Sequence, residues 1–557
     1  MASNSNKSTT SSSFRRILKV ISLERNETSA IYFFAILNGL IDLSLPLGIQ
    51  SIISFVLGGA VSTSLVILIV LVVIGVFFNG LLHVNQMRLI EKIQQKIFAR
   101  YSFEFADRIP KLNLKAVDGY YLPELVNRFF DVITLQKSIS SLLLDIPVAL
   151  IQILFGLSLL SFYHPVFIVF GLVLLIILYI ILSISGSRGL ETSLQESDYK
   201  YKLVGWLQEM GRAVHSFKFS TNTELNIHRT DDLVIGYLEA RTAHFKILLF
   251  QYWSLISFKL IITAVMLGVG SYLLVTQQLN IGQFIAAEIV ILMVISSVEK
   301  IIVYLDKVYD VLTSLEKLSK ITDKPIEKDG HILLSKETQG LSIGMRSVSF
   351  SYDDDGKKVL ENVNLDLKPN ERVCLKGPAG SGKSTLLRLM GGAFKEFEGQ
   401  LVFNGIPVND YVLDSLRSQK GILLSRQDIF QGTLLENITM GNTSIEPHAI
   451  IELCTELGID GLFTEFKEGF STQLDATGRR LSKRMKHKIL LLRALINKPK
   501  LLLLQDPFEG LEEDIKVKLI TYLLDKNRSH TVMVATNSQR FSSQCDRIIH
   551  LKEGKIA

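Results

Sequence analysis

The sequence contains few cysteines. Only Cys374, Cys454 and Cys545 occur among its 557 residues, and no two of them form a Cys-x-x-Cys pair. This spacing excludes a disulfide framework and a cysteine-based zinc site, and it fits a reducing cytosol. All three lie in the second half of the chain, where we expect them to be buried small apolar residues.

Charge is also scarce. Charged residues make up 20% of the chain, hydrophobic residues 48%, and the mean hydropathy is +0.31. A soluble protein carries about 25% charge, so these values predict a part embedded in lipid. The net charge of +6 fits the Lys and Arg excess that membrane proteins keep on the cytoplasmic side. No basic stripe with interleaved aromatic residues is present, so the sequence predicts no nucleic-acid partner.

The beginning of the chain shows no cleavable signal peptide. Met1–Ser13 consists almost entirely of Ser, Thr and Asn and is predicted to be a disordered tail. Phe14–Leu23 is a short amphipathic stretch that carries Arg15, Arg16 and Lys19. We expect it to lie as an elbow helix along the inner leaflet, with these cations among the lipid headgroups.

Six apolar runs have about the 20 residues that a bilayer requires. They are Ala30–Leu57, Ser64–His83, Ile139–Phe162, Val166–Ser185, Leu255–Thr276 and Phe284–Leu305. The short connectors between them lack charged residues, whereas Arg88–Lys137 and Ser187–Lys246 are long and rich in Lys and Arg. The positive-inside rule therefore predicts a multi-pass protein in contact with membrane lipids, with both termini in the cytosol. Helical periodicity in the long connectors indicates that the spans continue well beyond the membrane.

Ionisable residues fall inside the predicted spans, among them Asp42, Lys259 and Glu288. Such groups are costly in hydrocarbon and should face a cavity, a partner helix or water. Two interpretations stay open at this point. They line a polar pathway, or they form structural pairs between helices.

The chain after the last span has the composition of a soluble α/β domain. We predict a helical extension to residue 321, a polar linker over 322–340 and a nucleotide-binding domain over 341–557. The expected fold is therefore a six-helix membrane domain at 14–321 followed by an α/β P-loop domain.

One motif carries the chemistry of the soluble domain. This motif, Gly377–Thr385, has the pattern G-x-x-x-x-G-K-[ST]. A strand-like run, Arg372–Leu375, precedes it, and a helix-like run, Leu386–Met390, follows it. Glycines in such a loop let backbone N–H groups close around phosphate oxygens at a helix N-terminus. Lys383 would reach the β- and γ-phosphates of ATP, and the Ser384 hydroxyl would hold Mg²⁺. The predicted nucleotide-binding residues here are Gly377, Pro378, Ala379, Gly380, Ser381, Gly382, Lys383, Ser384 and Thr385.

This half of the chain resembles the nucleotide-binding domain of an ATP-binding-cassette (ABC) transporter, and the whole chain resembles a half-transporter of the exporter type. Ser349–Tyr352 is similar to the family's A-loop, which implies that Tyr352 stacks on adenine. A role as a cross-strand aromatic is the alternative for Tyr352. Ser425–Phe430 is similar to the Q-loop, which implies that Gln427 contacts Mg²⁺ or the attacking water.

The sequence departs from the family pattern at three places. The signature glycines are replaced in Leu481–Met485, where Ser482 is followed by Lys483 and Arg484. Gln505 stands at the Walker B aspartate position, and Asp506 stands at the position of the catalytic glutamate. The switch histidine corresponds to Asn537. An amide at position 505 is also a change that experimenters introduce to trap ATP-bound states, and the sequence leaves its origin open.

These departures predict retained ATP binding with slow hydrolysis. Each one weakens stabilisation of the charge that develops in phosphoryl transfer, and losing one such donor costs about 10²–10³ in rate. Lys483 and Arg484 would lie beside the partner's γ-phosphate in a closed dimer and act like arginine fingers, or they would simply form a solvated helix start. Both interpretations stay open.

The resemblance also implies partners and coupling. Each family site borrows the signature of a second subunit, so a homodimer is the default and a heterodimer stays open. Gly119–Arg128 resembles the first intracellular helix pair, and Arg212–Thr223 is expected to contain the second. Substrate and any periplasmic adaptor are not specified by the sequence.

The sequence thus predicts an ATP-dependent exporter half in a bacterial inner membrane. Leu43–Gln50 faintly resembles protein and peptide exporters of the type I secretion group, which favours a polypeptide substrate, with lipid or drug as alternatives. No peptidase domain fits ahead of Phe14. A nearly non-hydrolysing gate or heterodimer subunit is the second hypothesis, and a purely structural membrane scaffold is the third.

Overall fold

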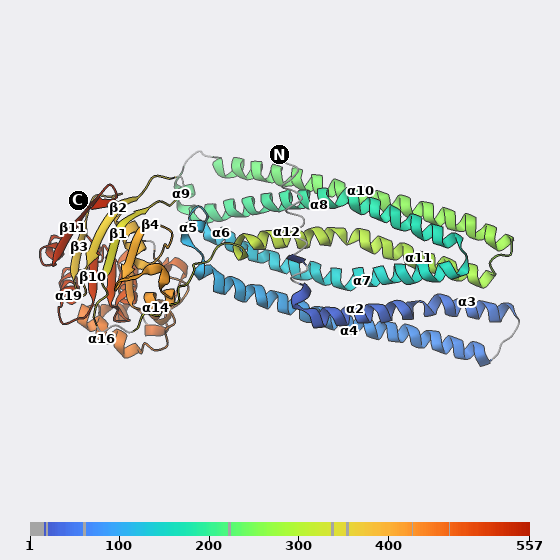
Figure 1. Cartoon of the computed structure of the whole chain (residues 1–557), viewed down its shortest axis with the longest axis horizontal. Coiled ribbons are helices and arrows are strands. Elements are labelled where there is room, and N and C mark those ends of the chain that lie inside the picture. Colours follow the sequence, from blue (N-terminus) through green and yellow to red (C-terminus); the bar gives the residue numbers. More distant parts are fainter. Residues whose placement is uncertain are drawn as a thin grey trace. The chain divides into compact units, whose positions relative to one another are not determined.

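The computed structural model describes residues 16–17, 21–58, 63–220, 224–335, 339–352, 356–425, 427–466 and 468–556. The predicted tail at 1–13 lies outside the described residues, as does half of the predicted amphipathic stretch. The chain divides into two compact units (Figure 1). The first comprises Met1–Pro110 with Tyr120–Lys324, and the second comprises Lys111–Gly119 with Pro325–Ala557.

The first unit is helical. Within the described residues, six helical segments are long and apolar enough to cross a membrane, which confirms the predicted number of spans. They are formed by α2 (Arg25–Asp42) with α3 (Ser44–Leu57), α4 (Thr63–Arg108), α7 (Asp131–Tyr163), α8 (Val166–Arg212), α10 (Leu225–Val275), and α11 (Ile281–Val303) with α12 (Leu305–Thr322). Short pieces join them, namely η1 (Ile109–Lys111), α6 (Leu122–Val126), η2 (Asn127–Phe130) and α9 (Val214–Phe219).

Three of these helices are much longer than a bilayer is thick. Helices α4, α8 and α10 have 46, 47 and 51 residues, whereas about 20 suffice to cross the hydrocarbon. An unbroken helix satisfies its own backbone N–H and C=O groups both in lipid and in water. The predicted continuation of the spans as long helices is therefore confirmed (Figure 1).

Polar residues inside the spans are engaged mainly with neighbouring helices. Asp42 on α2 accepts hydrogen bonds from Asn79 on α4 and from Gln152 on α7, the latter at 2.6 Å. Lys259 on α10 pairs with Glu299 on α11. These contacts favour the structural interpretation for Asp42 and Lys259. Glu288 differs, because its buried Oε2 has no hydrogen-bond partner among the described residues.

The second unit contains three β-sheets. The largest has the strand order β12-β11-β3-β10-β9-β6, a second has the order β2-β1-β4-β5, and β7 pairs with β8. The strands are β1 (Ile343–Phe350), β2 (Leu360–Leu367), β3 (Arg372–Lys376), β4 (Glu398–Phe403), β5 (Ile406–Pro407), β6 (Lys420–Leu423), β7 (Gly432–Thr433), β8 (Gln473–Leu474), β9 (Leu501–Gln505), β10 (Thr531–Ala535), β11 (Arg547–Lys552) and β12 (Lys555–Ile556).

This unit also contains α-helices. They are α13 (Lys383–Gly391), α14 (Leu413–Ser418), α15 (Leu434–Thr439), α16 (Pro447–Leu457), α17 (Gly461–Glu465), α18 (Lys483–Leu495), α19 (Glu513–Leu524) and α20 (Gln539–Ser542). Of these, α13, α14 and α18 pack against strands of the largest sheet. Side chains of β9 alternate between two apolar cores, with Leu501 and Leu503 in one and Leu502 and Leu504 in the other. Both faces of the strand are thus buried, as expected in a parallel sheet. The predicted α/β fold of this part is confirmed.

A short segment of the first half of the chain belongs to the second unit. Residues 111–119 contain α5 (Leu114–Val117), whose N-terminus is capped by the side chain of Asn113. The Asn113 amide also donates to Glu396 Oε1 at 2.8 Å. Backbone hydrogen bonds join Lys111 and Asn113 to Glu327 and Pro325 at 2.8 and 3.0 Å.

The Asp42 contacts give a first testable prediction. In an Asp42→Leu variant, the amide groups of Asn79 and Gln152 lose their acceptor in a membrane-embedded site. Each buried unsatisfied donor costs about 1–3 kcal/mol, so the unfolding temperature of the detergent-solubilised protein should fall clearly. Asp42→Asn keeps an acceptor oxygen and should unfold closer to wild type. Equal unfolding temperatures for the two variants would contradict a stabilising role for this network.

Candidate functional site

The predicted site residues follow neighbouring parallel strands. Strands β3, β10, β9 and β6 lie side by side in that order and run parallel. The Gly-rich loop follows β3, Asn537 follows β10, Asp506 follows β9, and Gln427 follows β6. The carboxyl ends of parallel strands meet at one edge of a sheet, where ligands of such folds bind. The sheet topology therefore brings together residues that are up to 160 positions apart (Gly377 to Asn537) in the sequence.

The Gly-rich loop is shaped by its glycines. Gly380 and Gly382 have φ angles of +78° and +100°, which side-chain-bearing residues rarely adopt. A Cβ atom on Gly377 would lie 2.2 Å from the carbonyl oxygen of Leu551. Lys383 folds over the loop, with Nζ donating to the carbonyls of Gly377 and Pro378 at 2.7 and 2.8 Å. The loop then leads directly into α13.

The same loop contains an unsatisfied polar group that fits an anionic ligand. Ser381 is 3% exposed, and its buried Oγ has no hydrogen-bond partner among the described residues. A buried hydroxyl without a partner costs free energy unless a ligand supplies one. Together with the positive end of α13 and the Lys383 ammonium, these features fit the phosphate groups of a nucleotide.

Tyr352 lies close to the Gly-rich loop. Its hydroxyl is 3.0 Å from Thr385 Oγ1 and accepts a hydrogen bond from Arg388 at 3.3 Å. Its ring packs edge-on against Phe350 and Phe394, with centroid distances of 5.1 and 5.7 Å. The ring is thus part of an aromatic cluster beside the P-loop. Stacking on adenine stays a prediction.

One cavity connects several of the other predicted residues. It measures about 390 Å³ and is lined by Gln427, Lys483, Arg484, Gln505 and Asp506. The loop that carries Gln427, the start of α18 and the end of β9 therefore meet within one subunit. Tyr352, the Gly-rich loop, Ser482 and Asn537 are not among its lining residues. Asn537 is exposed just beyond β10.

Asp506 lies in a constrained turn directly after β9. Its φ is +46°, and its backbone N–H donates to the carbonyl of Ala535 at 2.8 Å, which fixes the turn after β9. Burial raises the pKa of the Asp506 carboxyl, the charge of Glu509 adds to the increase, and Lys383 and His487 oppose it. A carboxylate with a raised pKa is a better proton acceptor for an attacking water.

Gln505 and Gln427 offer amide oxygens instead of carboxylates. Gln505 Oε1 is buried without a hydrogen-bond partner among the described residues. Gln427 Oε1 accepts from the backbone N–H of Leu424 at 3.2 Å, which closes its own loop. No group of three or more His, Cys, Asp or Glu side chains in the described part of the chain is placed to hold a metal. Mg²⁺ prefers oxygen ligands together with substrate phosphates, so the Ser384 hydroxyl and the free Gln505 oxygen fit it, with less protein charge than a carboxylate supplies.

The signature region begins helix α18. The Ser482 hydroxyl accepts from the backbone N–H of Met485 at 3.1 Å and caps the helix. Arg484 pairs with Glu512 at 2.9 Å, and Lys488 pairs with the same carboxylate at 3.2 Å. Burial opposes ionisation of Glu512, but hydrogen bonds from its backbone N–H, Lys488 and Arg484 hold its pKa below the usual range. Lys483 is exposed.

Sequence reasoning missed two contacts made by residues that line this cavity, namely His487 and Arg484. His487 Nε2 lies 2.8 Å from the carbonyl oxygen of Pro507 and so ties α18 to the loop after β9. Glu512 is the counter-ion of Arg484, 28 positions away in the chain. Neither contact leaves a signal in sequence spacing, because both depend on how α18 packs beside β9.

These features define a class of protein, one that joins a membrane-spanning helical unit to a P-loop nucleotide-binding unit. Residues 28–298 match the family described as the ABC transporter transmembrane region, and residues 360–509 match the family described as ABC transporter. The chain therefore belongs to the ABC transporter family and has the organisation of an exporter-type half-transporter, as the resemblance implied.

Curated relatives match mainly over part of their length. An ATP-dependent lipid A-core flippase of Hahella chejuensis is 29% identical over 42% of this chain and 40% of its own. The leukotoxin export ATP-binding protein LtxB of Aggregatibacter actinomycetemcomitans is 27% identical over 52% of this chain and 41% of its own. The alpha-hemolysin translocation ATP-binding protein HlyB of Escherichia coli O157:H7 is 27% identical over 53% and 42%. The chain thus spans about two-fifths of the length of these relatives.

A solved structure shares the whole fold. The structure of a bacterial Atm1-family ABC exporter with ATP bound superimposes with a TM-score of 0.85, over 96% of this chain and 95% of that one. The sequence identity is 17%, so the likeness concerns the fold.

The Gly377 geometry gives a second prediction. Gly377→Ala would drive a Cβ against the backbone oxygen of Leu551 and displace the phosphate loop. Overpacking of this kind costs about 1–3 kcal/mol, so the affinity for a fluorescent ATP analogue should fall roughly tenfold or more. Gly461→Ala is the control, because a Cβ there meets nothing within 4 Å. Wild-type affinity in Gly377→Ala would contradict this account of the loop.

Proposed function

We propose that this chain is one half of an ATP-dependent exporter that works as a dimer in a bacterial inner membrane, with both termini in the cytosol. The observation that carries the proposal is that six span-length helices and a P-loop at the edge of a parallel sheet occur in one polypeptide. ATP and Mg²⁺ are its proposed cofactors. Tyr352, the Gly-rich loop, Ser482, Lys483 and Arg484 are proposed to bind the nucleotide, and Asp506, Gln505, Gln427 and Asn537 to act in hydrolysis.

A polypeptide is the proposed substrate. Two relatives are named for the export of a leukotoxin and the translocation of alpha-hemolysin, which supports this choice. A lipid is the alternative substrate, because another relative is named as a lipid A-core flippase. A periplasmic adaptor would be a further partner if the chain serves protein secretion.

ATP would drive transport by a shift in populations. It can move the membrane helices only by as much as it binds the closed dimer better than the open one. Residues 111–119 provide a covalent route for this shift, since they belong to the nucleotide-binding unit while α4 and α6 on either side belong to the membrane unit. The Asn113–Glu396 hydrogen bond helps to hold this segment.

Hydrolysis is proposed to be slow. Gln505 stands where the family has the Walker B aspartate and offers a neutral oxygen to the metal. Asn537 stands where the family has the switch histidine and carries no positive charge. Asp506 keeps a base in place, on a side chain one methylene shorter than glutamate. If turnover proves negligible, a gate or heterodimer subunit that binds ATP without hydrolysing it is the second candidate, and the unpartnered Gln505 oxygen favours it.

A substitution of Lys383 distinguishes the transport function from the alternative functions. In the reconstituted protein, Lys383→Ala should abolish ATPase activity and weaken ATP binding, because the ammonium is the main charge on the phosphates. Turnover that depends on Lys383 supports the pump, and tight binding without turnover supports the gate. Absence of ATP binding in the wild type would leave only a structural scaffold.

Restoring the family carboxylate tests the cause of slow turnover. Gln505→Asp should raise kcat by about tenfold or more, because a charged ligand would again hold the metal in the transition state. The affinity for ATP should change little, since the Gly-rich loop dominates it. Gln400→Asp, at an exposed position on β4, controls for the added charge. An unchanged kcat in Gln505→Asp would show that the amide does not limit hydrolysis.

The signature cations are tested by their removal. The Arg484–Glu512 pair is exposed, and such pairs contribute about 0–1 kcal/mol, so Arg484 can leave Glu512 at little cost to reach a partner's γ-phosphate. We therefore expect Arg484→Ala to lower kcat about tenfold or more, and Lys483→Ala to weaken ATP binding. Arg480→Ala is the matched control, because Arg480 pairs with Asp475 and is 89% exposed. Wild-type kcat and ATP affinity in both signature variants would exclude the arginine-finger role.

A further inference from the structure

A polar cavity lies between four helices of the membrane unit. It measures about 240 Å³ and is lined by residues of α7, α8, α10 and α12. Its α8 and α12 residues follow the predicted spans that end at Ser185 and Leu305, and its α10 residues precede the span that begins at Leu255. The cavity therefore lies just outside the predicted hydrocarbon region, on the side of the long helical extensions. None of the nucleotide-site residues lines it.

The lining carries an excess of negative charge. Four carboxylates face two permanent cations, and a single histidine, His244, completes the ionisable set. We call this cavity the anionic chamber and define it by Asp131, Glu196, Asp306, Asp310, Lys200 and Arg241. Buried charges of one sign are costly unless a partner neutralises them.

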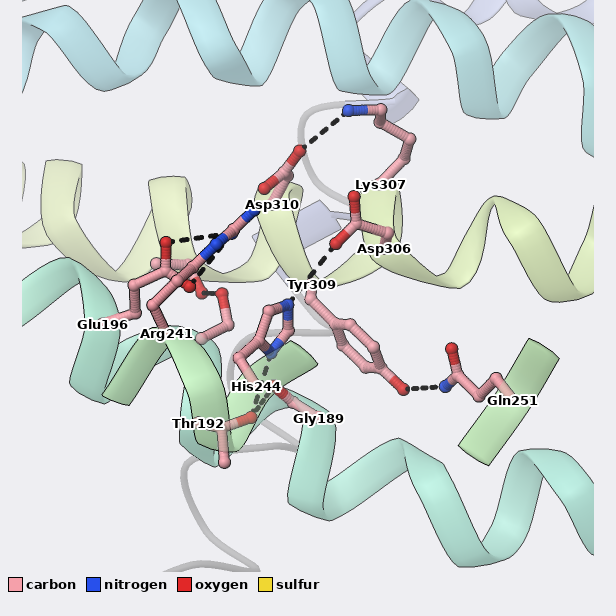
Figure 2. A network of polar contacts seen from close by, with 12 residues as sticks. Gly189, Thr192, Glu196, Arg241, His244, Gln251, Asp306, Lys307, Tyr309 and Asp310 are labelled. Atoms are coloured by element: carbon pink, nitrogen blue, oxygen red, sulfur yellow. Dashed lines mark hydrogen bonds and ion pairs between the residues drawn. The ribbon is translucent and has the colours of Figure 1, made fainter. Parts of the chain in front are cut away.

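The two permanent cations are each paired with one carboxylate. Arg241 pairs with Glu196 (Figure 2), with a separation of 3.1 Å, and Lys200 lies 3.4 Å from Asp131. Asp131 also accepts from the Tyr201 hydroxyl at 2.6 Å. Asp306 and Asp310 on α12 are therefore the two carboxylates of the lining that pair with neither Arg241 nor Lys200.

Asp306 and Asp310 have weaker partners. Asp306 Oδ1 lies 3.4 Å from His244 Nε2, and the other ring nitrogen of His244 lies 3.0 Å from Thr192 Oγ1 (Figure 2). Asp310 contacts Lys307 at 3.2 Å and Ser138 at 3.4 Å. With His244 neutral, the chamber and Lys307 together remain net negative.

Ser197 supplies an independent indication of a ligand. It lines the chamber, is 6% exposed, and its Oγ has no hydrogen-bond partner among the described residues. Other hydroxyls of the lining come from Thr134, Ser193, Thr313 and Ser314. Hydroxyl and carboxylate oxygens arranged around a cavity suit a group with several N–H donors, because an ammonium group has three donors and no acceptor.

A metal ion fits this lining less well than an organic cation. In the part of the chain that the structure describes, no three His, Cys, Asp or Glu side chains are grouped closely enough to hold a metal. The carboxylates are instead spread over three helices around a cavity large enough for an amino-acid side chain.

The walls of the chamber are held at fixed spacing. Tyr309 on α12 is 2% exposed and packs where a Cβ on Gly189 of α8 would lie 2.2 Å from its ring. Its hydroxyl accepts from Gln251 on α10 at 3.0 Å (Figure 2). The same hydroxyl donates to the carbonyl of Ser185 on α8 at 3.1 Å. The contacts of Tyr309 therefore hold α8, α10 and α12 together beside the cavity. Fixed walls preorganise the cavity for a ligand.

We propose that the anionic chamber binds a primary ammonium group of the exported molecule, a lysine side chain or amino terminus of a polypeptide. The ammonium contacts Asp310 and Asp306 on α12 and the Ser197 hydroxyl on α8. This inference rests on the proposed export function and specifies the substrate chemistry that the chamber selects.

The test measures binding directly, without nucleotide. The full chain in phosphatidylcholine nanodiscs is titrated with trilysine and with fully acetylated trilysine in a calorimeter. Trilysine should bind at least tenfold more tightly than its acetylated form. Spermidine is the third probe, and weaker binding than trilysine supports a peptide source, whereas tighter binding overturns the peptide source.

Three variants locate the binding site. Asp310→Asn should weaken trilysine binding about tenfold or more, because a hydrogen bond to a charged group is lost. Ser197→Ala should weaken it about 2–10-fold, and it is safe for folding because it removes a buried hydroxyl that has no partner. Glu239→Gln, at an exposed position on α10, should bind like wild type.

The outcomes separate this inference from the proposed function. Equal affinity for trilysine and its acetylated form, or wild-type affinity in both Asp310→Asn and Ser197→Ala, overturns the ammonium site. Lys383→Ala should bind trilysine like wild type although it lacks ATPase activity. Intact trilysine binding in a wild-type protein without ATP-driven transport would overturn the export function alone.

Discussion

Strand β9 is the element on which the nucleotide site depends. It is paired along both edges, with β10 and with β6, and its four leucines are fully buried between two apolar cores. Because its backbone and both its faces are constrained, the residues at its carboxyl end have little freedom. Gln505 and Asp506 therefore lie between the loops that carry Asn537 and Gln427. The hydrogen bond from the Asp506 backbone N–H to the Ala535 carbonyl fixes the turn after β9.

The charges around this edge are redistributed relative to the family pattern. A negative charge is absent at Gln505, while Lys483 and Arg484 add positive charge at the start of α18. Glu512 holds Arg484 and Lys488 within the same subunit. The combined effect favours attraction of phosphate over polarisation of a metal ion, because amides hold Mg²⁺ less strongly than carboxylates. These side chains are the basis of the proposal that the protein binds ATP but hydrolyses it slowly.

Polar side chains of the membrane unit have different surroundings inside and outside the predicted spans. Within the spans, Asp42 and Lys259 are paired with side chains of neighbouring helices, as expected where hydrocarbon offers no hydrogen bonds. Just beyond the spans, α8, α10 and α12 together with α7 enclose a cavity that is lined by polar residues. Charged and hydroxyl groups line this cavity, and contacts of Tyr309 hold its walls, so this region is suited to receiving a polar ligand in a way that the tightly packed α11 is not.

The sequence alone determined the six spans, the long helical extensions and the P-loop fold, because hydropathy, periodicity and a contiguous motif are local properties. It also indicated the altered residues Gln505, Lys483, Arg484 and Asn537 by their position relative to local motifs. The tertiary structure decided which groups are partnered. The Glu512–Arg484 pair, the His487 contact, the aromatic cluster at Tyr352 and the anionic chamber join residues from separate elements. Their distances follow from helix and strand packing, and no spacing along the chain encodes them.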